Sequence, residues 1–226
     1  HLLTPRLSYR YIDGADHGRA YIPPIDRRTF MTYLPPLGLG DIRNLDDLRP
    51  LHTLRLALDN TLQTRDPVYG SRDLAVFNVA NDLRFERLAG ERELSATHIE
   101  LGLMPVRWLQ FDLYETFSPQ DRAQQYLSTG VTVRDGEAWM LRLGVHHLRN
   151  DIEAYYTEGL LRLNEAYSAF ARVEYDARRE RFNSQRYGLY QNIDNTWRIL
   201  YAIEFSNGPR RESNFGFHVG VEMLRF

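Results

Sequence analysis

In several segments of this sequence, charged residues are separated by even numbers of positions. Residues with this spacing include Arg55, Asp59, Arg142, Arg172, Glu174, Arg198 and Glu204. On a strand, such residues share one face, because successive side chains point to opposite sides. Guanidinium groups bind phosphates and carboxylates through paired hydrogen bonds. We therefore predict that these residues face a lumen, where they either contact an anionic ligand or form a hydrated lining of paired charges, and the sequence leaves both interpretations open.

Arginine is used for all 28 basic residues, and lysine is absent. A genome rich in G and C would produce this bias without any functional pressure. Selection for planar, bidentate anion recognition would produce it as well. Both explanations remain open.

The seven histidines form no catalytic or metal-binding pattern. His146 and His147 are neighbours in a predicted strand, so they point to opposite faces and do not readily share a metal. His98 and His218 each stand alone on the polar face of a predicted strand. No Ser–His–acid spacing and no glycine-rich phosphate loop is present. We therefore predict no catalytic residue, no metal, no cofactor and no enzymatic activity.

Apolar and polar residues alternate along most of the chain, which is typical of strands with one apolar and one polar face. The clearest example is the closing stretch, residues 195–226. Its first apolar face is Trp197, Ile199, Tyr201, Ile203 and Phe205. Runs of about 11 residues match a tilted strand that crosses a bilayer, and they exceed the usual soluble strand of about 5–6 residues.

The alternation predicts about twelve strands and no helix. The predicted ranges are 3–12, 51–65, 73–86, 94–103, 106–117, 125–133, 139–146, 152–163, 167–176, 182–193, 196–205 and 214–226. Tight turns are expected at Met104–Pro105 and at Asp135–Gly136. The fold class is therefore predicted as all-β, the portion of an antiparallel transmembrane β-barrel that meanders in long strands. A soluble β-sandwich is a further alternative.

Composition narrows the class of protein. The formal net charge is −2, which predicts no nucleic-acid binding. No run approaches the roughly 18 apolar residues of a membrane-spanning helix. Disulfides and thiolate metal sites are excluded because the chain has no cysteine. Since no signal peptide opens the sequence at His1, we expect an exported mature chain or a fragment.

Loop lengths suggest a sidedness. With the C-terminus placed in the periplasm, counting back through the strands assigns most short links to the periplasmic side. Residues 13–50 then form a long extracellular loop. Short periplasmic turns with longer external loops are typical of outer-membrane barrels.

Several segments, in this order and spacing, resemble the C-terminal barrel of the LptD family. They are LTPRLSYRYID, YIPPIDRRTF, LHTLRLALDNTLQTR, DGEAWMLRLGVHH and QNIDNTWRILYAIEFSNGPRRESNFGFHVGV. This family comprises the outer-membrane lipopolysaccharide assembly proteins of Gram-negative bacteria, also called organic solvent tolerance proteins. The resemblance implies that residues 1–226 are the C-terminal part of a larger barrel that serves cell envelope biogenesis.

The resemblance also implies partners. They are lipopolysaccharide, an LptE-like plug lipoprotein, a periplasmic Lpt bridge component and the barrel assembly machinery, all at the outer membrane. Many family members have a cysteine shortly before the tryptophan of the penultimate strand. The corresponding Trp197 follows Thr196 here and the chain has no cysteine, so disulfide-controlled maturation is not expected.

In this family the last strand forms one edge of a lateral gate. The resemblance places that strand at residues 214–226. The gate candidates are Asn214, Gly216, His218, Gly220 and Phe226. Glycine weakens a strand, which would suit a seam that opens. Because Met223 and Leu224 are adjacent and Phe226 is out of phase, we expect a bulge or a frayed end there.

A self-contained, twelve-stranded porin-like channel is the main alternative function. It predicts that the first and last strands pair and that residues 13–50 fold inward as a constriction. The LptD hypothesis predicts instead that the first strand pairs with a strand from elsewhere in a larger barrel.

Overall fold

The structure is a computed structural model of the chain. It describes residues 1–13, 30–35, 37, 51–66, 70–85, 94–119, 123–193, 196–207 and 214–223. Most of the predicted loop at 13–50 lies outside these residues. So do Asp194 and Asn195, and so does the predicted irregularity at residues 224–226.

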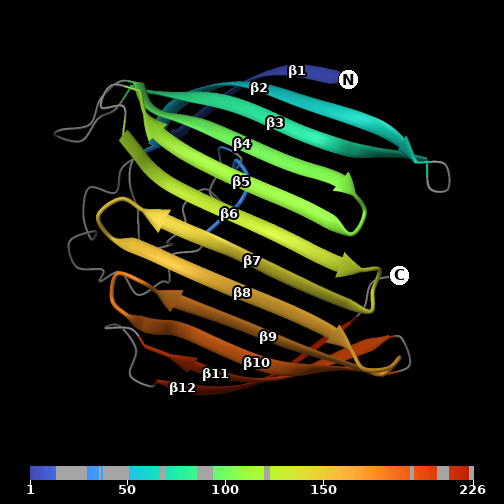
Figure 1. The fold of residues 1–226 in the computed structure, drawn as a ribbon. Coiled ribbons are helices and arrows are strands. Elements are labelled where there is room, and N and C mark those ends of the chain that lie inside the picture. The colour runs from blue at the N-terminus through green and yellow to red at the C-terminus, as the bar shows by residue number, and fades with distance from the viewer. Residues whose placement is uncertain are drawn as a thin grey trace. The chain divides into compact units, whose positions relative to one another are not determined.

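Twelve antiparallel strands form one sheet in sequence order (Figure 1). The strands are β1 (Leu2–Ile12), β2 (Leu51–Asp66), β3 (Gly70–Arg84), β4 (Leu94–Val106), β5 (Leu109–Ser118), β6 (Ala123–Asp135), β7 (Trp139–Leu148), β8 (Ile152–Arg162), β9 (Tyr167–Asp176), β10 (Arg181–Ile193), β11 (Trp197–Ser206) and β12 (Phe215–Met223). The predicted all-β meander is confirmed, and its strands have 9 to 16 residues. Among the described residues, no helix is long and apolar enough to cross a membrane.

The predicted turn at Met104–Pro105 is wrong. Strand β4 continues through both residues, and the turn lies at Arg107–Trp108. Proline is tolerated near a strand end, where the missing N–H removes only one ladder bond. Here the carbonyl groups of Met104 and Pro105 accept hydrogen bonds from the Arg72 guanidinium. These bonds hold the end of β4 beside β3.

The link between β2 and β3 is shorter than predicted. The two strands stay paired as far as Asp66 opposite Gly70. Gly70 has a φ of 84°, a backbone conformation that glycine adopts without steric cost. The polar residues of this region therefore extend the two strands, although their composition is typical of a loop.

The sheet has an apolar face that is exposed and a polar face on which buried side chains gather. On the apolar face, Leu7, Phe217 and Val221 are 68%, 63% and 65% exposed. The most buried side chains on the other face are small or polar, among them Ser128 and Thr53. Burial is therefore the reverse of that in a soluble protein, where large apolar residues are mostly inside.

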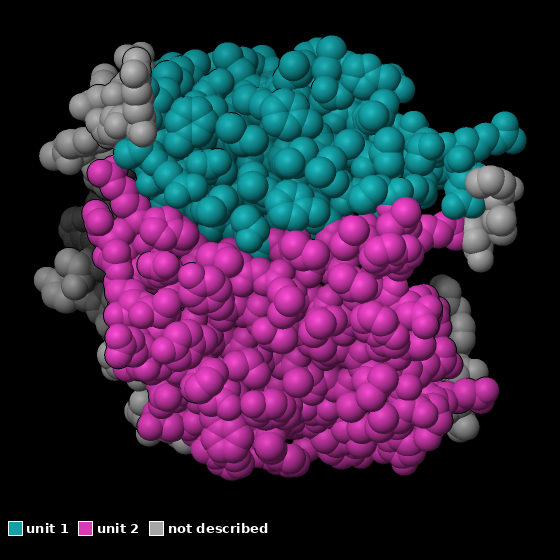
Figure 2. Space-filling view, viewed as in Figure 1, with its two compact units in different colours: residues 1–105, 111–129 teal, residues 106–110, 130–226 magenta. Residues whose placement is uncertain are grey.

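The described chain divides into two compact units (Figure 2). Unit 1 contains residues 1–105 and 111–129, which include β1–β3, β4 without its last residue, most of β5 and the first half of β6. Unit 2 contains residues 106–110 and 130–226, which include the end of β4, the start of β5, the rest of β6 and β7–β12.

Candidate functional site on the polar face

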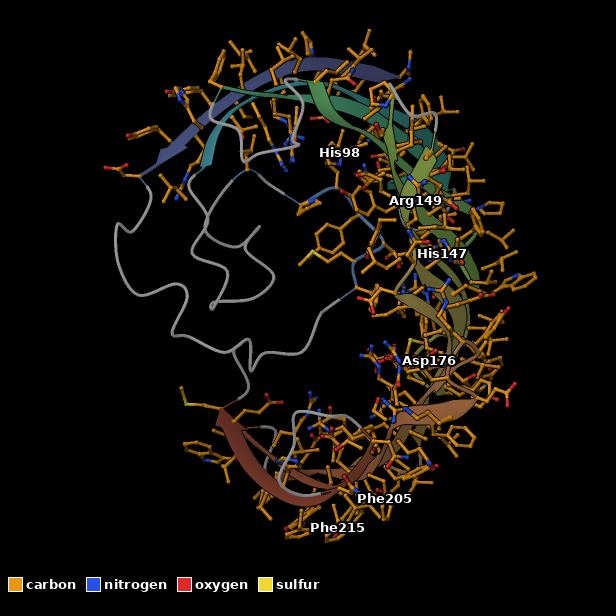
Figure 3. All side chains as sticks on the ribbon, turned by 90° about the vertical axis from the view of Figure 1, so that its left-hand side faces the viewer. His98, His147, Arg149, Asp176, Phe205 and Phe215 are labelled. Atoms are coloured by element: carbon orange, nitrogen blue, oxygen red, sulfur yellow. The ribbon has the colours of Figure 1, made fainter. Side chains whose placement is uncertain are left out.

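A buried ion-pair network occupies the polar face of unit 1. Arg55 of β2 donates two hydrogen bonds to the Asp82 carboxylate of β3, at 2.7 and 3.0 Å. The ring of His98 lies 2.9 Å from the same carboxylate and 2.8 Å from the Tyr114 hydroxyl. Figure 3 shows His98 on the concave side of its strands. Four neighbouring strands, β2 to β5, therefore contribute to one network around Asp82.

The same network holds a segment of the predicted loop. Tyr126 of β6 accepts a hydrogen bond from the Met31 amide at 2.8 Å and donates one to the Met31 carbonyl at 3.0 Å. The ring of Phe30 stacks on Tyr126 with centroids 5.8 Å apart. Arg55 also donates a hydrogen bond to the carbonyl of Pro35. Residues 30–35 are thus bound against the polar face of unit 1.

Glu100 extends this contact along β4. Its carboxylate accepts hydrogen bonds from the Leu34 amide at 3.1 Å and from the Asn78 side chain at 3.0 Å. Leu34 is 8% exposed. A carboxylate that accepts backbone and amide N–H groups is well satisfied without a cation. The segment is therefore fixed by its main chain as well as by packing.

A row of charged residues crosses the polar face of unit 2 at one level. Each residue stands directly opposite the next in the antiparallel register. The row is Arg142 (β7), Glu158 (β8), Arg172 (β9), Arg186 (β10) and Glu204 (β11), and Glu204 stands opposite Gly216 of β12. Opposite charges alternate along it except in the middle, where Arg172 faces Arg186. Like charges directly opposite each other destabilise a sheet.

The residues at the centre of this row have few partners. In the part of the chain that the structure describes, the side chains of Glu158, Arg172 and Arg186 form no hydrogen bond or ion pair. The Nε of Arg186 is also buried and has no hydrogen-bond partner there. By contrast, Arg142 donates a hydrogen bond to the Tyr156 hydroxyl at 3.2 Å. The centre of the row is therefore the least satisfied part of the polar face of unit 2.

Two aromatic rings lie beside the row. Phe170 and Tyr190 are in contact, with ring centroids 5.0 Å apart. The guanidinium of Arg186 lies 5.8 Å from the Phe170 centroid, and that of Arg198 lies 5.4 Å from the Tyr190 centroid. The Phe170 ring covers Gly188, where an added Cβ would lie 2.4 Å from a ring carbon. A side chain at Gly188 would therefore displace the ring.

A cavity of about 330 Å³ opens next to these rings. Its lining residues are Met140, Glu158, Gly159, Leu160, Ser168, Phe170, Tyr190 and Arg198. This volume is at the lower end of the range of small-molecule sites, about 300–1,000 Å³. The lining combines one carboxylate, one guanidinium, hydroxyl groups and aromatic carbon.

The turn after β9 is organised by Asp176. Its carboxylate accepts hydrogen bonds from the backbone amides of Arg178 and Arg179 and from the Arg179 guanidinium at 2.7 Å. Burial alone would raise the pKa of this carboxyl. The hydrogen bonds from Arg179 outweigh burial and hold the pKa of Asp176 below its ordinary value.

The predicted charged residues lie on the polar face, but the structure does not gather them into one site. Arg55 belongs to the network in unit 1. Asp59 forms an exposed ion pair with Arg6 at 3.3 Å. Arg142, Arg172 and Glu204 belong to the charged row of unit 2. Whether any of them faces a water-filled lumen remains a prediction.

The other two predicted positions lie away from the row. Glu174 accepts a hydrogen bond from the Asn183 side chain at 3.2 Å. Arg198 donates to Asn192 at 3.1 Å and lies 3.4 Å from Glu222. Both residues are therefore held by local polar contacts in unit 2.

The gate candidates lie on β12 or next to it, apart from Phe226, which is outside the described residues. Gly216 stands opposite Glu204, and Gly220 stands opposite Leu200. Asn214 precedes the strand, and its carbonyl accepts a hydrogen bond from the Ser206 amide. Strand β12 is a terminal member of the strand order and pairs with β11.

The prediction that His98 and His218 stand alone is wrong. His98 lies between Asp82 and Tyr114, as described above. His218 lies 3.6 Å from the carboxylate of Glu204. Their partners come from neighbouring strands, so a pattern along one strand does not reveal them. Even so, the described residues contain no group of His, Cys, Asp and Glu side chains that could hold a metal ion.

Sequence reasoning missed the aromatic residues of the polar face. Tyr114, Tyr126 and Phe170 occupy positions that alternate with apolar residues, and they were not identified as part of any site. The sequence did contain a sign of them, because each lies at a position that the alternation assigns to the polar face of its strand. An aromatic residue in that phase indicates contact across strands or with a ligand.

No protein-family model matches the chain, and no curated protein matches it. The all-β, twelve-stranded meander is compatible with an outer-membrane β-barrel. Any assignment of function therefore rests on the residues and their geometry.

Proposed function

We propose that this chain is the C-terminal part of an LptD-like barrel in the outer membrane, which transports lipopolysaccharide and inserts it into the outer leaflet. The main support is the contrast between the two faces of its long strands. Large apolar side chains are exposed on one face, and arginine and acidic residues occupy the other. Lipid would contact the first face and the phosphorylated sugar head of lipopolysaccharide the second.

Strand β12 supports a lateral gate in this proposal. It is the shortest of the described strands, with 9 residues, and it contains Gly216 and Gly220. A short strand with two glycines contributes fewer side-chain contacts across its pair than a β-branched strand does. Pairing at this edge could then open for an amphiphile without unfolding the neighbouring strands.

The proposal includes the partners that the resemblance implies. An LptE-like lipoprotein would plug the barrel, and a periplasmic Lpt bridge component would deliver lipopolysaccharide. The barrel assembly machinery would insert the chain with its C-terminus in the periplasm. Residues 13–50 would be extracellular, and their segment 30–35 would return to the polar face, as its contacts with Tyr126 suggest.

Site-specific photo-cross-linking tests the proposal. A photoreactive amino acid is placed at Glu174, on the polar face, or at its neighbour Val173, on the apolar face, in the full protein within living cells. We expect a lipopolysaccharide adduct at Glu174 that disappears when the bridge component is depleted. Adducts at Val173 should not depend on the bridge. No adduct at Glu174 while the bridge is active would contradict transport along this face.

A self-contained porin-like channel is the second candidate, and residues 30–35 favour it. A loop segment bound to the polar face is consistent with the constriction that this candidate predicts. Because the chain has no cysteine, engineered cysteine pairs between β1 and β12 give an unambiguous test. Disulfide formation between them in the membrane, together with steady ion conductance, would favour the channel over the translocon.

A further inference from the structure

The middle of the charged row in unit 2 has an arrangement that its own residues do not explain. Arg172 and Arg186 are cross-strand neighbours with the same charge. Strands in a sheet lie about 4.8 Å apart, so the two side chains start close together. Such a pair is unfavourable unless an anion lies between or above the two groups.

No described residue forms an ion pair with Arg186. Its Nε is buried without a hydrogen-bond partner among the described residues. A buried guanidinium N–H without an acceptor is costly, and most buried polar groups have a partner. Glu204 stands opposite Arg186 in the register, but no ion pair joins them in the described structure. The unused donor indicates a place for a ligand oxygen.

The aromatic rings next to this pair indicate what the rest of the ligand is. Phe170 lies under Arg186, and Tyr190 packs against Phe170. The adjoining cavity is also lined by Glu158 and Ser168, whose oxygens can bind hydroxyl groups. Apolar ring faces beside hydroxyl-binding groups suit the C–H and O–H groups of a sugar.

We propose that the polar face of β8–β11 holds a binding site for a phosphate-bearing sugar. Arg172 and Arg186 bind the phosphate through charge-assisted hydrogen bonds. Phe170 and Tyr190 pack against the sugar, and Glu158 accepts hydrogen bonds from its hydroxyl groups. The site stands on the side chains of unit 2 alone and does not require the transport activity proposed above.

Calorimetric titration of the full protein in detergent tests the site, with glucose 1-phosphate as the probe and glucose as its neutral counterpart. We expect saturable binding of glucose 1-phosphate and much weaker binding of glucose. Either Arg186→Gln or Arg172→Gln should raise the Kd about tenfold or more, because each removes charge-assisted hydrogen bonds. Phe170→Leu should raise the Kd for glucose 1-phosphate less, by roughly threefold.

Arg149→Gln is the matched control. Arg149 is exposed in the turn after β7, so its loss removes one guanidinium from the same unit without touching the row. This variant should bind the probe as the wild type does. Each variant is checked by its thermal unfolding, so that weaker binding is not confused with misfolding.

Competition identifies the source of the ligand. If lipopolysaccharide micelles displace glucose 1-phosphate, the site binds a lipid headgroup; if they do not, it binds a free sugar phosphate. Both results support the site. It is overturned if glucose 1-phosphate shows no saturable binding, if glucose binds equally well, or if both arginine variants stay within twofold of the wild type. Failure of lipopolysaccharide transport with intact probe binding would contradict only the proposed function.

Discussion

The polar faces of the two units differ in how their charged groups are satisfied. In unit 1, the Asp82 carboxylate is bound by both Arg55 and His98. Arg55 also donates a hydrogen bond to Pro35, so the network includes residues 30–35. In unit 2, Arg172 and Arg186 stand side by side next to a cavity. The same alternation of residues therefore produces an internally bonded surface in one unit and, in the other, two neighbouring arginines that form no ion pair among the described residues.

The difference follows from which residues face each other across strands. Opposite charges in contact neutralise each other and lock the strands together, as Arg55 and Asp82 do. Like charges in contact keep an electrostatic potential available for a ligand, at a cost in stability. Unit 1 should therefore lose the most stability when a charge is removed, and unit 2 should lose binding.

The largest effect is expected for Asp82→Asn. The substitution leaves the Arg55 guanidinium buried without its counter-charge, which typically costs about 3–5 kcal/mol. The free energy of unfolding in urea, measured in detergent or lipid, should fall by that amount. Asp59→Asn is the control, because the Asp59–Arg6 pair is exposed and its loss should cost at most about 1 kcal/mol. If the two substitutions lowered the free energy of unfolding equally, the buried Asp82 pair would be no more important for stability than the exposed Asp59 pair.

Gly188→Ala tests how tightly the aromatic part of unit 2 is packed. The added Cβ would lie 2.4 Å from the Phe170 ring and 2.6 Å from the Tyr201 carbonyl oxygen. Overpacking of this kind typically costs about 1–3 kcal/mol. Unfolding should therefore occur at lower urea concentration, and the Phe170 ring should move away from Gly188.

The matched control for that substitution is Gly159→Ala. The nearest atom to its added Cβ is the Met140 carbonyl oxygen at 4.0 Å. Alanine is favoured over glycine within a strand by about 0.5–1 kcal/mol, so this variant should be as stable as the wild type or slightly more so. If both alanine variants behave alike, the polar face of unit 2 is looser than the structure indicates.

Tyr126→Phe tests the attachment of residues 30–35 to unit 1. It removes both hydrogen bonds to Met31 and keeps the ring that stacks on Phe30. The local cost should be about 1–2 kcal/mol. Amide exchange at Met31 should accelerate by roughly five- to thirtyfold, since 1.4 kcal/mol corresponds to a factor of ten.

Tyr175→Phe serves as its control. Tyr175 contacts Phe182 through its ring, and the structure gives its hydroxyl no hydrogen bond among the described residues. Exchange at Met31 should be unchanged in this variant. Unchanged exchange in Tyr126→Phe as well would mean that the segment is held by Glu100 and packing alone.

The smallest effect is expected from Asp176, the last residue of β9. Its carboxyl has a lowered pKa in the folded protein, so the ionised form contributes stability above the ordinary pKa of about 3.9. That contribution is lost as the pH falls through the lowered pKa. Asp176→Asn should cost about 1 kcal/mol at pH 7, because Arg179 is partly exposed. The difference from the wild type should shrink towards zero in acid, as measured by urea unfolding at several pH values; a constant difference would argue against the ion pair.

Strand positions were largely predictable from the sequence, because alternation with period two leaves a clear pattern in long strands. All twelve strands were predicted, and the apolar face of β11 was assigned residue by residue. The ends were less predictable. The sequence suggested a turn at Pro105 because proline has no N–H to donate. At the end of β4, however, Pro105 uses only its carbonyl group, which accepts a hydrogen bond from Arg72.

The site was less predictable because it depends on the register between strands. The sequence shows Arg172 and Arg186 as two polar-face arginines, but only the pairing of β9 with β10 places them opposite each other. A shift of register would create different neighbours. In the same way, His98 meets Asp82 only because β3 and β4 are aligned as they are.

The strand order has a consequence for how the chain acquires its structure. Every strand pairs with the strands before and after it in the sequence. Each new hairpin can therefore pair with the edge strand of the sheet already formed, without passing through a closed loop. The sheet can be extended strand by strand in sequence order. Contacts between sequence neighbours form faster than distant ones. The order of the strands along the chain can thus also serve as the order of assembly, with each completed edge acting as the template for the next hairpin.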